Sequence, residues 1–418
     1  MHGFRFRLLL ITVIGCALIG VAIPAAHAQN YHVIYNFTGH ADGGSPAGGL
    51  VMDQHGNLYG LTFDYGTGTC DFGGSPGCGT AYELERHGQA YLFNLLHTFT
   101  GGSDGAYASG RMVFGPDGGL YGTTTFGGGG NCTFGQGCGT VFRLRPPATV
   151  CKSITCTWSE TVLYRFTGTN DGMWPQLGDL IFDSTGNIYG TTPDNVFELV
   201  HSNGGWAFNA LFTFTQSQGG CCSFSGVIPD SAGNLYGTTY AGSTGSGLVF
   251  ELSPSSGGWT YNTLYNFQGQ TDGSEPQGNL IWDNEGNLYG TTPMGGTNNL
   301  GTVYELTPST GYFSVLHSFY GPEGEIPFDA VVFDAQGNLY GTTWGGGSHG
   351  QGTVFKLTPA GDGTWTYQRL YDFTGQSDGA RPESKLIVDA NGNVYGTTIY
   401  GGSSNCNGGC GVVFEITP

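Results

Sequence analysis

The amino-acid sequence predicts an all-β fold, a seven-bladed β-propeller with four short strands in each blade. A phrase close to Gly-Asn-Leu-Tyr-Gly-Thr-Thr recurs along the chain, and its tyrosines lie 47 to 68 residues apart. A period of this length exceeds the roughly 20 to 30 residues of a solenoid coil and suits about four strands with their turns. The repeated tyrosines are Tyr59, Tyr121, Tyr189, Tyr236, Tyr289, Tyr340 and Tyr395.

Each repeat contains four apolar or alternating runs separated by turn residues, which is typical of four short strands. The first run is illustrated by residues 180–182, and the second contains the repeated tyrosine. The third resembles Gly-Thr-Val-Phe-Glu-Leu, as in residues 301–306, and the fourth ends in Leu-Tyr-x-Phe, as in residues 259–267. An Asp-x-x-Gly motif between the first two runs indicates a tight turn, because aspartate caps its own backbone and glycine accepts a positive φ.

The two ends of the chain predict how the ring closes. Residues 34–37 match the ending of a fourth strand, whereas residues 411–418 match a third strand. We therefore expect residues 29–39 to supply the missing outer strand of the last blade, so that residues 29–418 form one closed propeller domain. A β-helix or an open array would have no need of this offset.

Residues 1–28 are typical of a secretory signal peptide, with a basic start, an apolar run from Leu8 to Ile23 and small residues before Gln29. We expect its removal and secretion of the chain into the periplasm or the medium. The alternative is a lipoprotein attached through Cys16, although further apolar residues follow this cysteine. No second long apolar run occurs, so the sequence predicts no membrane span.

The charge of the exported chain narrows the choice of partners. Loss of Arg5 and Arg7 with the signal leaves 10 basic residues against 31 acidic ones, which is a formal charge of −21. Such a surface repels phosphates and anionic lipid headgroups, so nucleic acids and anionic membranes are poor partners. We expect the protein to be a monomer.

Ten cysteines remain after removal of the signal, and an even number in a secreted chain indicates disulfide bonds. A zinc site is disfavoured by the ligand spacing. Cys221 and Cys222 are adjacent, and the sequence allows either a vicinal disulfide or two free thiols. The predicted bonds, each within one local segment, are Cys70–Cys78, Cys132–Cys138, Cys151–Cys156 and Cys406–Cys410.

The motifs in their fixed order resemble the GloVer tandem-repeat family of secreted bacterial proteins. They are Leu-Tyr-x-Phe-Thr-Gly, Asp-Gly, Asp-x-x-Gly-Asn-Leu-Tyr-Gly-Thr-Thr and Gly-Thr-Val-Phe-Glu-Leu-Thr-Pro, and they extend over residues 31–418. The resemblance implies export and, in the choice-of-anchor type, a C-terminal surface anchor, and it carries over no catalytic motif. The chain ends at Thr417 and Pro418 without a sorting segment, so we expect release rather than anchoring.

Two sets of loops are expected to share one face of the propeller, which we call the loop face. The inter-blade loops, which join the fourth strand of one blade to the first strand of the next, carry Asp-Gly. This dipeptide indicates either a Ca²⁺ site at the channel mouth or a preferred turn. The aspartates are Asp42, Asp104, Asp171, Asp272 and Asp378, with Glu323 at the matching place in one repeat.

The second set, the 2–3 loops between the second and third strands of a blade, presents aromatic residues among Gly, Ser and Asn. Such rings suit stacking on sugars, with nearby amides as hydrogen-bond partners, and they equally suit capping of the blade interfaces. The aromatic residues are Phe63, Phe126, Tyr240, Trp344 and Tyr400.

Catalytic signatures are missing from the sequence: it has no nucleophile elbow, zinc-protease, P-loop or dinucleotide motif. The glutamate of the third strand is replaced by Arg143 and Lys356 in two repeats, so we interpret this position as outer surface. The leading hypothesis is a secreted, non-enzymatic propeller that binds an extracellular carbohydrate or protein, with Ca²⁺ as its one candidate cofactor. The alternative is a propeller-type glycoside hydrolase or polysaccharide lyase, in which two carboxylates from different loops meet in one cleft.

Overall fold

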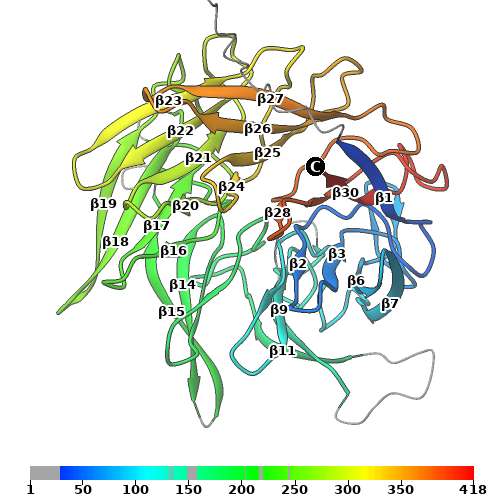
Figure 1. The fold of residues 1–418 in the computed structure, drawn as a ribbon. Helices are drawn as coiled ribbons and strands as arrows, with labels where there is room; N and C mark the ends of the chain where they lie inside the picture. The colour runs from blue at the N-terminus through cyan, green and yellow to red at the C-terminus, as the bar shows by residue number, and fades with distance from the viewer. Residues whose placement is uncertain are drawn as a thin grey trace, which may run out of the picture.

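The computed structural model describes residues 29–130, 132, 135–147, 158–202, 204–215, 220–242 and 245–418. Seven four-stranded sheets stand around a central opening as the blades of a propeller, which confirms the predicted fold (Figure 1). Within these residues no α-helix occurs, and hence none that could cross a membrane. The predicted signal peptide and the predicted Cys151–Cys156 bond lie outside the described residues.

Each blade begins with a two-residue strand beside the central opening and ends with a longer outer strand (Figure 1). Blade 1 contains β2 (Val51–Met52), β3 (Leu58–Thr62), β6 (Thr80–His87) and β7 (Ala90–Thr98). Blade 2 contains β8 (Val113–Phe114), β9 (Leu120–Thr124), β10 (Thr140–Arg145) and β11 (Ser159–Arg165). Blade 3 contains β12 (Ile181–Phe182), β13 (Ile188–Thr191), β14 (Asn195–Ser202) and β15 (Gly205–Thr213).

The next three blades repeat this order. Blade 4 contains β16 (Ile228–Pro229), β17 (Leu235–Thr239), β18 (Leu248–Ser255) and β19 (Gly258–Asn266). Blade 5 contains β20 (Ile281–Trp282), β21 (Leu288–Thr292), β22 (Thr302–Thr307) and β23 (Tyr312–Ser318). Blade 6 contains β24 (Val332–Phe333), β25 (Leu339–Thr343), β26 (Thr353–Pro359) and β27 (Trp365–Asp372). A separate hairpin of β4 (Asp71–Phe72) and β5 (Ser75–Pro76) lies in the 2–3 loop of blade 1.

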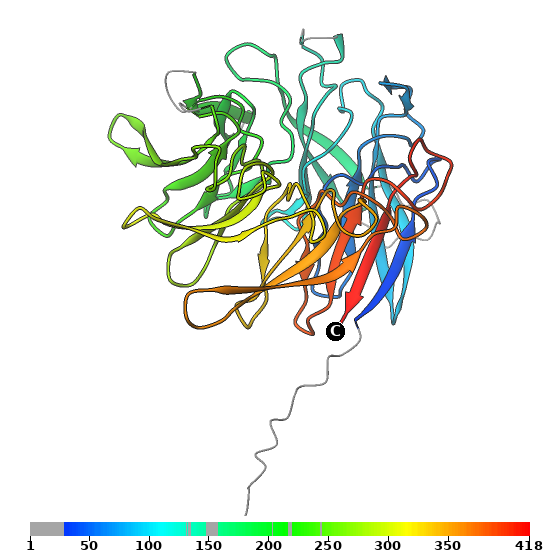
Figure 2. The ribbon, with the colours of Figure 1, turned by 90° about the horizontal axis from the view of Figure 1, so that it is seen from above.

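Blade 7 is completed from both ends of the chain, as predicted. It contains β28 (Ile387–Val388), β29 (Val394–Thr398), β30 (Val412–Thr417) and, as its outer strand, β1 (Asn30–Asn36). β1 pairs antiparallel with β30 from Asn30 opposite Thr417 to Asn36 opposite Val412. The beginning of β1 therefore lies beside the C-terminus (Figure 2).

The repeated glycine of the second strand is required by the third strand of the same blade. A Cβ atom on Gly237 would lie 2.7 Å from Cζ of Phe250, the residue directly opposite, which is closer than atoms approach without displacement. The aromatic ring thus lies over the glycine and fills the space that a side chain would take. The same relation joins Gly60 to Tyr82, Gly122 to Phe142, Gly190 to Phe197, Gly290 to Tyr304, Gly341 to Phe355 and Gly396 to Phe414.

The core is divided among seven clusters, one between each pair of neighbouring blades. At every interface, the phenylalanine that follows the fourth strand of one blade makes an edge-to-face contact with the aromatic residue in the third strand of the next blade. Phe267 contacts Tyr304 in this way, with 5.2 Å between ring centroids. At six interfaces a second pair of rings stacks, namely Tyr35–Phe93, Tyr164–Phe208, Phe212–Tyr261, Tyr265–Phe313, His317–Tyr367 and Tyr371–Tyr31.

The interface between blades 1 and 2 departs from this pattern, because His97 and Glu160 occupy the places of the stacked rings. Glu160 lies opposite Leu144 in the strand pairing, as the stacking residue Phe313 lies opposite Leu306 in blade 5. Burial raises the pKa of Glu160, and its Oε1 atom has no hydrogen-bond partner among the described residues. This interface therefore lacks the stacked pair of rings that the other six contain.

The Asp-x-x-Gly motif forms the predicted turn between the first two strands. Oδ1 of Asp230 accepts hydrogen bonds from the N–H groups of Ala232 and Asn234 at 2.8 and 2.9 Å, and its Oδ2 accepts from the Asn234 amide. Partial burial raises the pKa of Asp230, but these donors outweigh it and the pKa lies below its ordinary value. The Tyr236 hydroxyl bonds to Asp230 and also to the third-strand Glu251 at 3.0 Å. The third-strand glutamate, interpreted as outer surface, is thus a partner of the repeated tyrosine.

Candidate functional site

Short backbone bridges hold the inter-blade loops against the 2–3 loops, which places both sets on one face as predicted. Residue pairs Gly44–Asp64, Ala106–Phe126 and Ala380–Tyr400 form such bridges, and blades 4, 5 and 6 contain equivalent ones. Figure 2 shows these loops on the side of the ring away from the C-terminus. The loop face is therefore a defined surface, and its two sets of loops support each other.

The five predicted aspartates lie in five different inter-blade loops, and each is engaged within its own loop. Oδ2 of Asp171 accepts a hydrogen bond from the N–H of Thr167 at 2.8 Å and from the hydroxyl of Tyr164 at 2.9 Å. The corresponding N–H bonds reach Asp42, Asp104, Asp272 and Asp378. Across the described residues no group of three His, Cys, Asp or Glu side chains is arranged for a metal ion. The aspartates act as turn caps, and their binding of Ca²⁺ stays a prediction.

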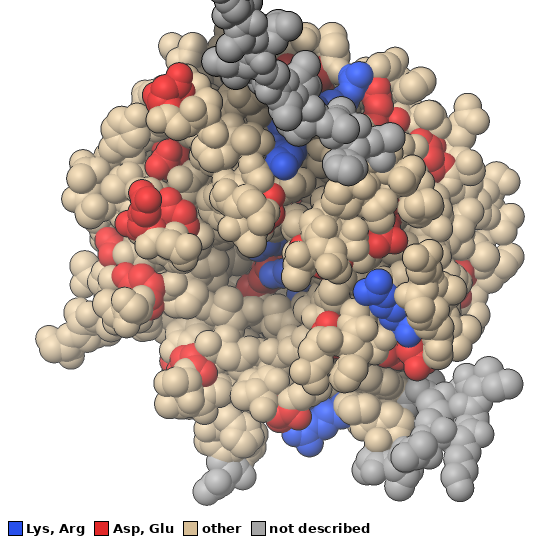
Figure 3. All heavy atoms as spheres, viewed as in Figure 1, with Lys and Arg blue, Asp and Glu red and all other residues tan. Residues whose placement is uncertain are grey.

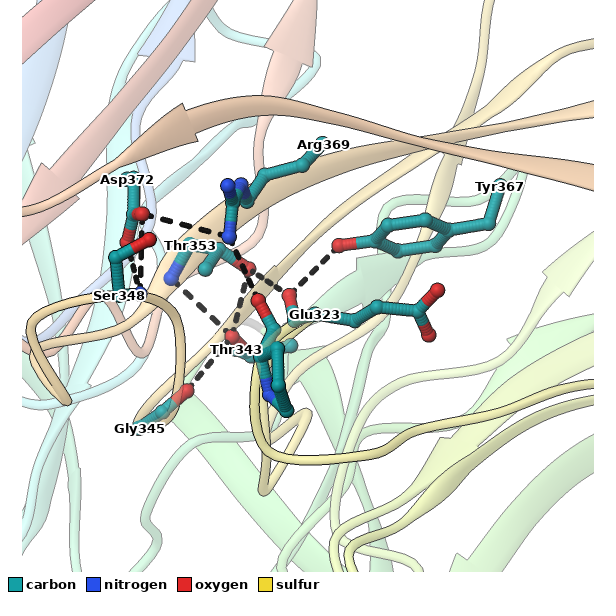
Figure 4. A network of polar contacts seen from close by, with 9 residues as sticks. Glu323, Thr343, Gly345, Ser348, Thr353, Tyr367, Arg369 and Asp372 are labelled. Carbon is teal, nitrogen blue, oxygen red and sulfur yellow. Dashed lines mark hydrogen bonds and ion pairs between the residues drawn. The ribbon is translucent and has the colours of Figure 1, made fainter.

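Glu323 takes the place of this aspartate in the loop between blades 5 and 6 (Figure 4). Its backbone carbonyl accepts hydrogen bonds from the hydroxyls of Thr353 at 3.0 Å and Tyr367 at 2.6 Å. Its carboxylate lies 2.9 Å from Nε2 of His317 and points away from Asp372. Like the aspartates, this acidic residue is engaged in its own blade interface.

A cavity of about 620 Å³ opens at the mouth of the channel on the loop face. It brings together three of the five predicted aromatic residues, Phe63, Phe126 and Tyr400, which come from the 2–3 loops of blades 1, 2 and 7. The hydroxyl and amide groups around it belong to Ser45, Ser75, Ser109, Thr125, Gln176, Gln277 and Asn407.

The three aromatic side chains differ in their exposure, and hence in how much of each one a ligand could contact. Phe126 is only 8% exposed, and its ring packs between Tyr107 at 5.7 Å and Trp174 at 6.1 Å. Phe63 is half-buried against Tyr107 at 5.2 Å. Tyr400 is 36% exposed, so about a third of its surface remains available to a ligand. Phe126 caps an interface, whereas Tyr400 presents its ring.

The other two predicted aromatic residues lie outside this cavity. The ring of Trp344 is covered by the guanidinium of Arg381, whose central carbon lies 3.7 Å from the ring centroid. Tyr240 packs against Phe224, with 5.8 Å between their centroids. The structure therefore divides the predicted set into three residues that share a cavity and two that do not.

Disulfide bonds brace the same three 2–3 loops that supply the cavity aromatics. The structure confirms the predicted bonds Cys70–Cys78, Cys132–Cys138 and Cys406–Cys410 in blades 1, 2 and 7. A Cβ on Gly39 of the neighbouring inter-blade loop would lie 2.4 Å from Sγ of Cys406, so bridge and loop are in close contact. Cys221 and Cys222 are free thiols in the structure, with their Sγ atoms 2.8 Å apart.

Two acidic side chains that the sequence interpretation did not single out line the cavity. Burial raises the pKa of Asp64 to about 6, against the opposing effect of the nearby Ser45 and Ser75 hydroxyls. Burial and the negative charge of Asp329 raise the pKa of Glu383 to about 7. Both carboxyl groups therefore hold a proton more readily than an ordinary surface carboxyl group does.

Deeper in the ring the channel is obstructed by charged side chains of both signs, which Figure 3 shows inside the central opening. Arg111 and Asp179 form an ion pair at 2.5 Å, and Oδ2 of Asp329 accepts the N–H of Lys385 at 2.8 Å. A small cavity of about 10 Å³ lies beside Asp329 and shares Gln277 and Glu383 with the larger cavity. A ligand at the mouth would therefore lie on the loop face rather than thread the ring.

Comparison with known proteins identifies the repeat. A sequence model of the Gloeobacter/Verrucomicrobia repeat matches residues 20–192, 64–281 and 277–418, so the chain belongs to this family, in agreement with the resemblance seen in its motifs. No functionally curated protein matches the sequence.

Solved structures share the fold at low sequence identity. Virginiamycin B lyase from Staphylococcus aureus superposes with a TM-score of 0.56 at 12% identity, over 93% of this chain and 99% of that one. An extracellular domain of a B. thetaiotaomicron protein gives 0.55 at 14%, over 93% of this chain and 42% of that one. The GH74 xyloglucanase from Xanthomonas campestris gives 0.50 at 15%, over 89% and 53%. These likenesses concern the propeller fold.

Proposed function

We propose that this member of the Gloeobacter/Verrucomicrobia repeat family is a secreted, non-enzymatic protein that binds an extracellular carbohydrate at the cavity on its loop face. The observation that carries the proposal is the wall formed by blades 7, 1 and 2. Each of these blades contributes a disulfide-braced loop with an aromatic residue to one cavity. Because a rigid wall loses little conformational entropy when a ligand binds, more of the free energy of stacking and hydrogen bonding contributes to affinity.

The chemistry of the cavity suits a sugar better than a protein surface. Its volume of about 620 Å³ lies within the range of small-ligand sites. The exposed ring of Tyr400 offers a flat apolar face, while Gln176, Gln277 and Asn407 can both donate and accept hydrogen bonds. A stable protein partner would instead need about 800 Å² of contact on each side. Secretion is supported by the disulfide bonds and the signal-like residues 1–28.

Binding of the secreted protein to a glycan array, followed by calorimetric titration of the positive glycans, tests this proposal. Tyr400→Ala should weaken binding by about 5- to 150-fold, which corresponds to the 1–3 kcal/mol expected for a lost aromatic contact. Tyr312→Ala is the matched control, because Tyr312 is 60% exposed but lies in the hairpin of blade 5. An array without positive glycans, or equal effects of the two variants, would contradict the proposal.

A second candidate function, glycoside hydrolysis, is favoured by one specific observation. Asp64 and Glu383 line one cavity, and burial raises the pKa of both carboxyl groups, to about 6 and about 7. A glycosidase needs such a pair, an acid that protonates the leaving oxygen and a carboxylate that activates water or attacks the sugar. Reducing-end assays on every bound glycan test it. Hydrolysis that is lost in Glu383→Gln, with binding retained, would replace the non-enzymatic proposal.

A further inference from the structure

A second cavity adjoins the first on the loop face, and Tyr400 stands between them. Its volume is about 290 Å³. Tyr400 and Asn407 line both cavities, so a chain of sugars lying across Tyr400 would enter the two together. The residues around the second cavity are Gln351, Gly375, Ala380, Arg381, Tyr400, Asn407 and Gly408, and none of them is acidic.

Arg381 is the one charged residue of this second cavity. Its guanidinium lies over the ring of Trp344 at 3.7 Å, a cation–π contact that helps to hold the group in place. Within the described part of the chain, no hydrogen bond or ion pair to this guanidinium is found. By contrast, Arg111 pairs with Asp179 and Arg369 pairs with Asp372. The positive charge of Arg381 acts on the Glu383 carboxyl and opposes the rise in its pKa, but the N–H donors of the guanidinium remain available to a ligand group.

The backbone at Arg381 adds an independent observation. Its φ is +54°, a left-handed conformation that is unfavourable for a side chain. The chain holds it there with a hydrogen bond from its N–H to the carbonyl of Gln351 at 2.8 Å and one from Ile399 N–H to its own carbonyl.

The same position is left-handed in all seven inter-blade loops, yet the side chain differs in every one. Glycine would relieve the strain and is abundant elsewhere in the chain, with 78 copies. The repeat therefore keeps the backbone conformation at this position and varies the side chain from blade to blade. The seven residues are Ser45, Tyr107, Trp174, Cys222, Glu275, Ile326 and Arg381.

We infer that Arg381, held on Trp344, forms a subsite for the carboxylate of an acidic sugar in a glycan that lies across Tyr400. The planar guanidinium offers parallel N–H donors that match a carboxylate, and its aromatic support leaves few conformations to lose on binding. This inference rests on the proposed function and names its substrate class, a glycan that contains uronic acid residues.

The acidic surface of the protein does not prevent such binding. Charges farther away than about 8 Å are largely screened at physiological ionic strength. The second cavity itself is lined by no acidic residue, and burial together with the charge of Asp329 raises the pKa of Glu383, the nearby acid of the first cavity. The net negative charge instead disfavours polyanions that do not present a carboxylate at Arg381.

The test compares uronate polysaccharides with their carboxyl-reduced forms, in which each uronic acid has become a neutral sugar. The panel contains pectic, alginate, glucuronoxylan and hyaluronan polymers together with neutral cellulose and xylan oligomers. We expect the secreted protein to bind at least one uronate polymer and to lose about tenfold or more in affinity for its carboxyl-reduced form. Arg381→Gln should cause the same loss, and Arg381→Lys an intermediate one.

Arg86→Gln is the matched control, because it removes one positive charge from the hairpin of blade 1, where Arg86 bonds to the Gly88 carbonyl. It should leave affinity unchanged. Binding of neutral glycans only, or of uronate polymers equally by wild type and Arg381→Gln, would overturn the Arg381 subsite while sparing the proposed function. No binding to any member of the panel or of the wider glycan array would overturn both. A melting temperature for Arg381→Gln close to that of wild type shows that any loss is local.

Discussion

Truncation of Tyr31 to alanine tests whether β1 closes the ring as a full member of the last blade. The ring of Tyr31 stacks on Tyr371 of blade 6 at 3.8 Å with 12° between the planes, and its hydroxyl bonds to the Asp378 carbonyl. Truncation of a buried aromatic residue costs about 3–5 kcal/mol, of which stacking accounts for about 1 kcal/mol. Because Tyr31 is half-buried, we expect about 3 kcal/mol.

Phe313→Ala is the matched control for this change. Phe313 stacks on Tyr265 at 3.9 Å with 7° between the planes, and it occupies the same register position in blade 5. Its strand is joined to the rest of its blade by a hairpin, whereas β1 is held in blade 7 through noncovalent contacts. If β1 closes the ring, both variants should lower the free energy of unfolding by similar amounts.

Urea titrations followed by tryptophan fluorescence measure these changes, and light scattering detects association through the edge of β30 that loss of β1 would expose. A cost below about 1 kcal/mol for Tyr31→Ala, beside about 3 kcal/mol for Phe313→Ala, would refute closure by β1. The N-terminal strand would then be an accessory to a ring that is stable without it.

Three further predictions concern the blades and loops. Glu160→Tyr should raise the free energy of unfolding by about 1 kcal/mol, because it lets a ring stack beside His97 as at the other interfaces; an unchanged urea midpoint would contradict this. Asp230→Ala should cost about 1–2 kcal/mol near pH 7. Since the pKa of Asp230 is lowered in the fold, wild type loses this stabilisation as the pH falls through that pKa, and the two urea midpoints should approach each other as the solution is acidified. Alkylation of the native protein, read by mass spectrometry, should label Cys221 and Cys222 and spare the six bridged cysteines; labelling of the latter would refute the bridges.

The fold could be predicted because each repeated motif makes the same local packing contact in every blade. Gly237 and Phe250 illustrate this, since the glycine exists to accept the ring that lies opposite it. The closure of the ring could be predicted as well. The C-terminal segment matches a third strand and the N-terminal segment matches a fourth strand, so the two complete one blade when the ring closes. Features that all seven repeats share in this way can be recognised from the sequence.

The site was predicted less completely, because it depends on residues that break the repeat. When the repeats are aligned on their tyrosines, Asp64 occupies the position of Phe126 and Tyr400 in the neighbouring blades. Glu383 likewise has no acidic counterpart three residues before the first buried apolar residue of any other blade. An alignment of the seven copies against each other would have identified both. Arg381 could not be found in this way, because its importance comes from a left-handed backbone and from contact with Trp344, which lies in another blade.

The unequal blades also explain where on the ring a ligand is expected. A closed ring of equivalent blades offers seven similar positions, and a glycan chain that covers a few of them would bind in several registers with little preference. The three disulfide-braced loops, the exposed Tyr400 and the unpaired Arg381 all lie on blades 7, 1 and 2. Concentrating these departures on adjacent blades gives one register a lower free energy than the others. The symmetric remainder then serves as the scaffold that holds this asymmetric segment rigid.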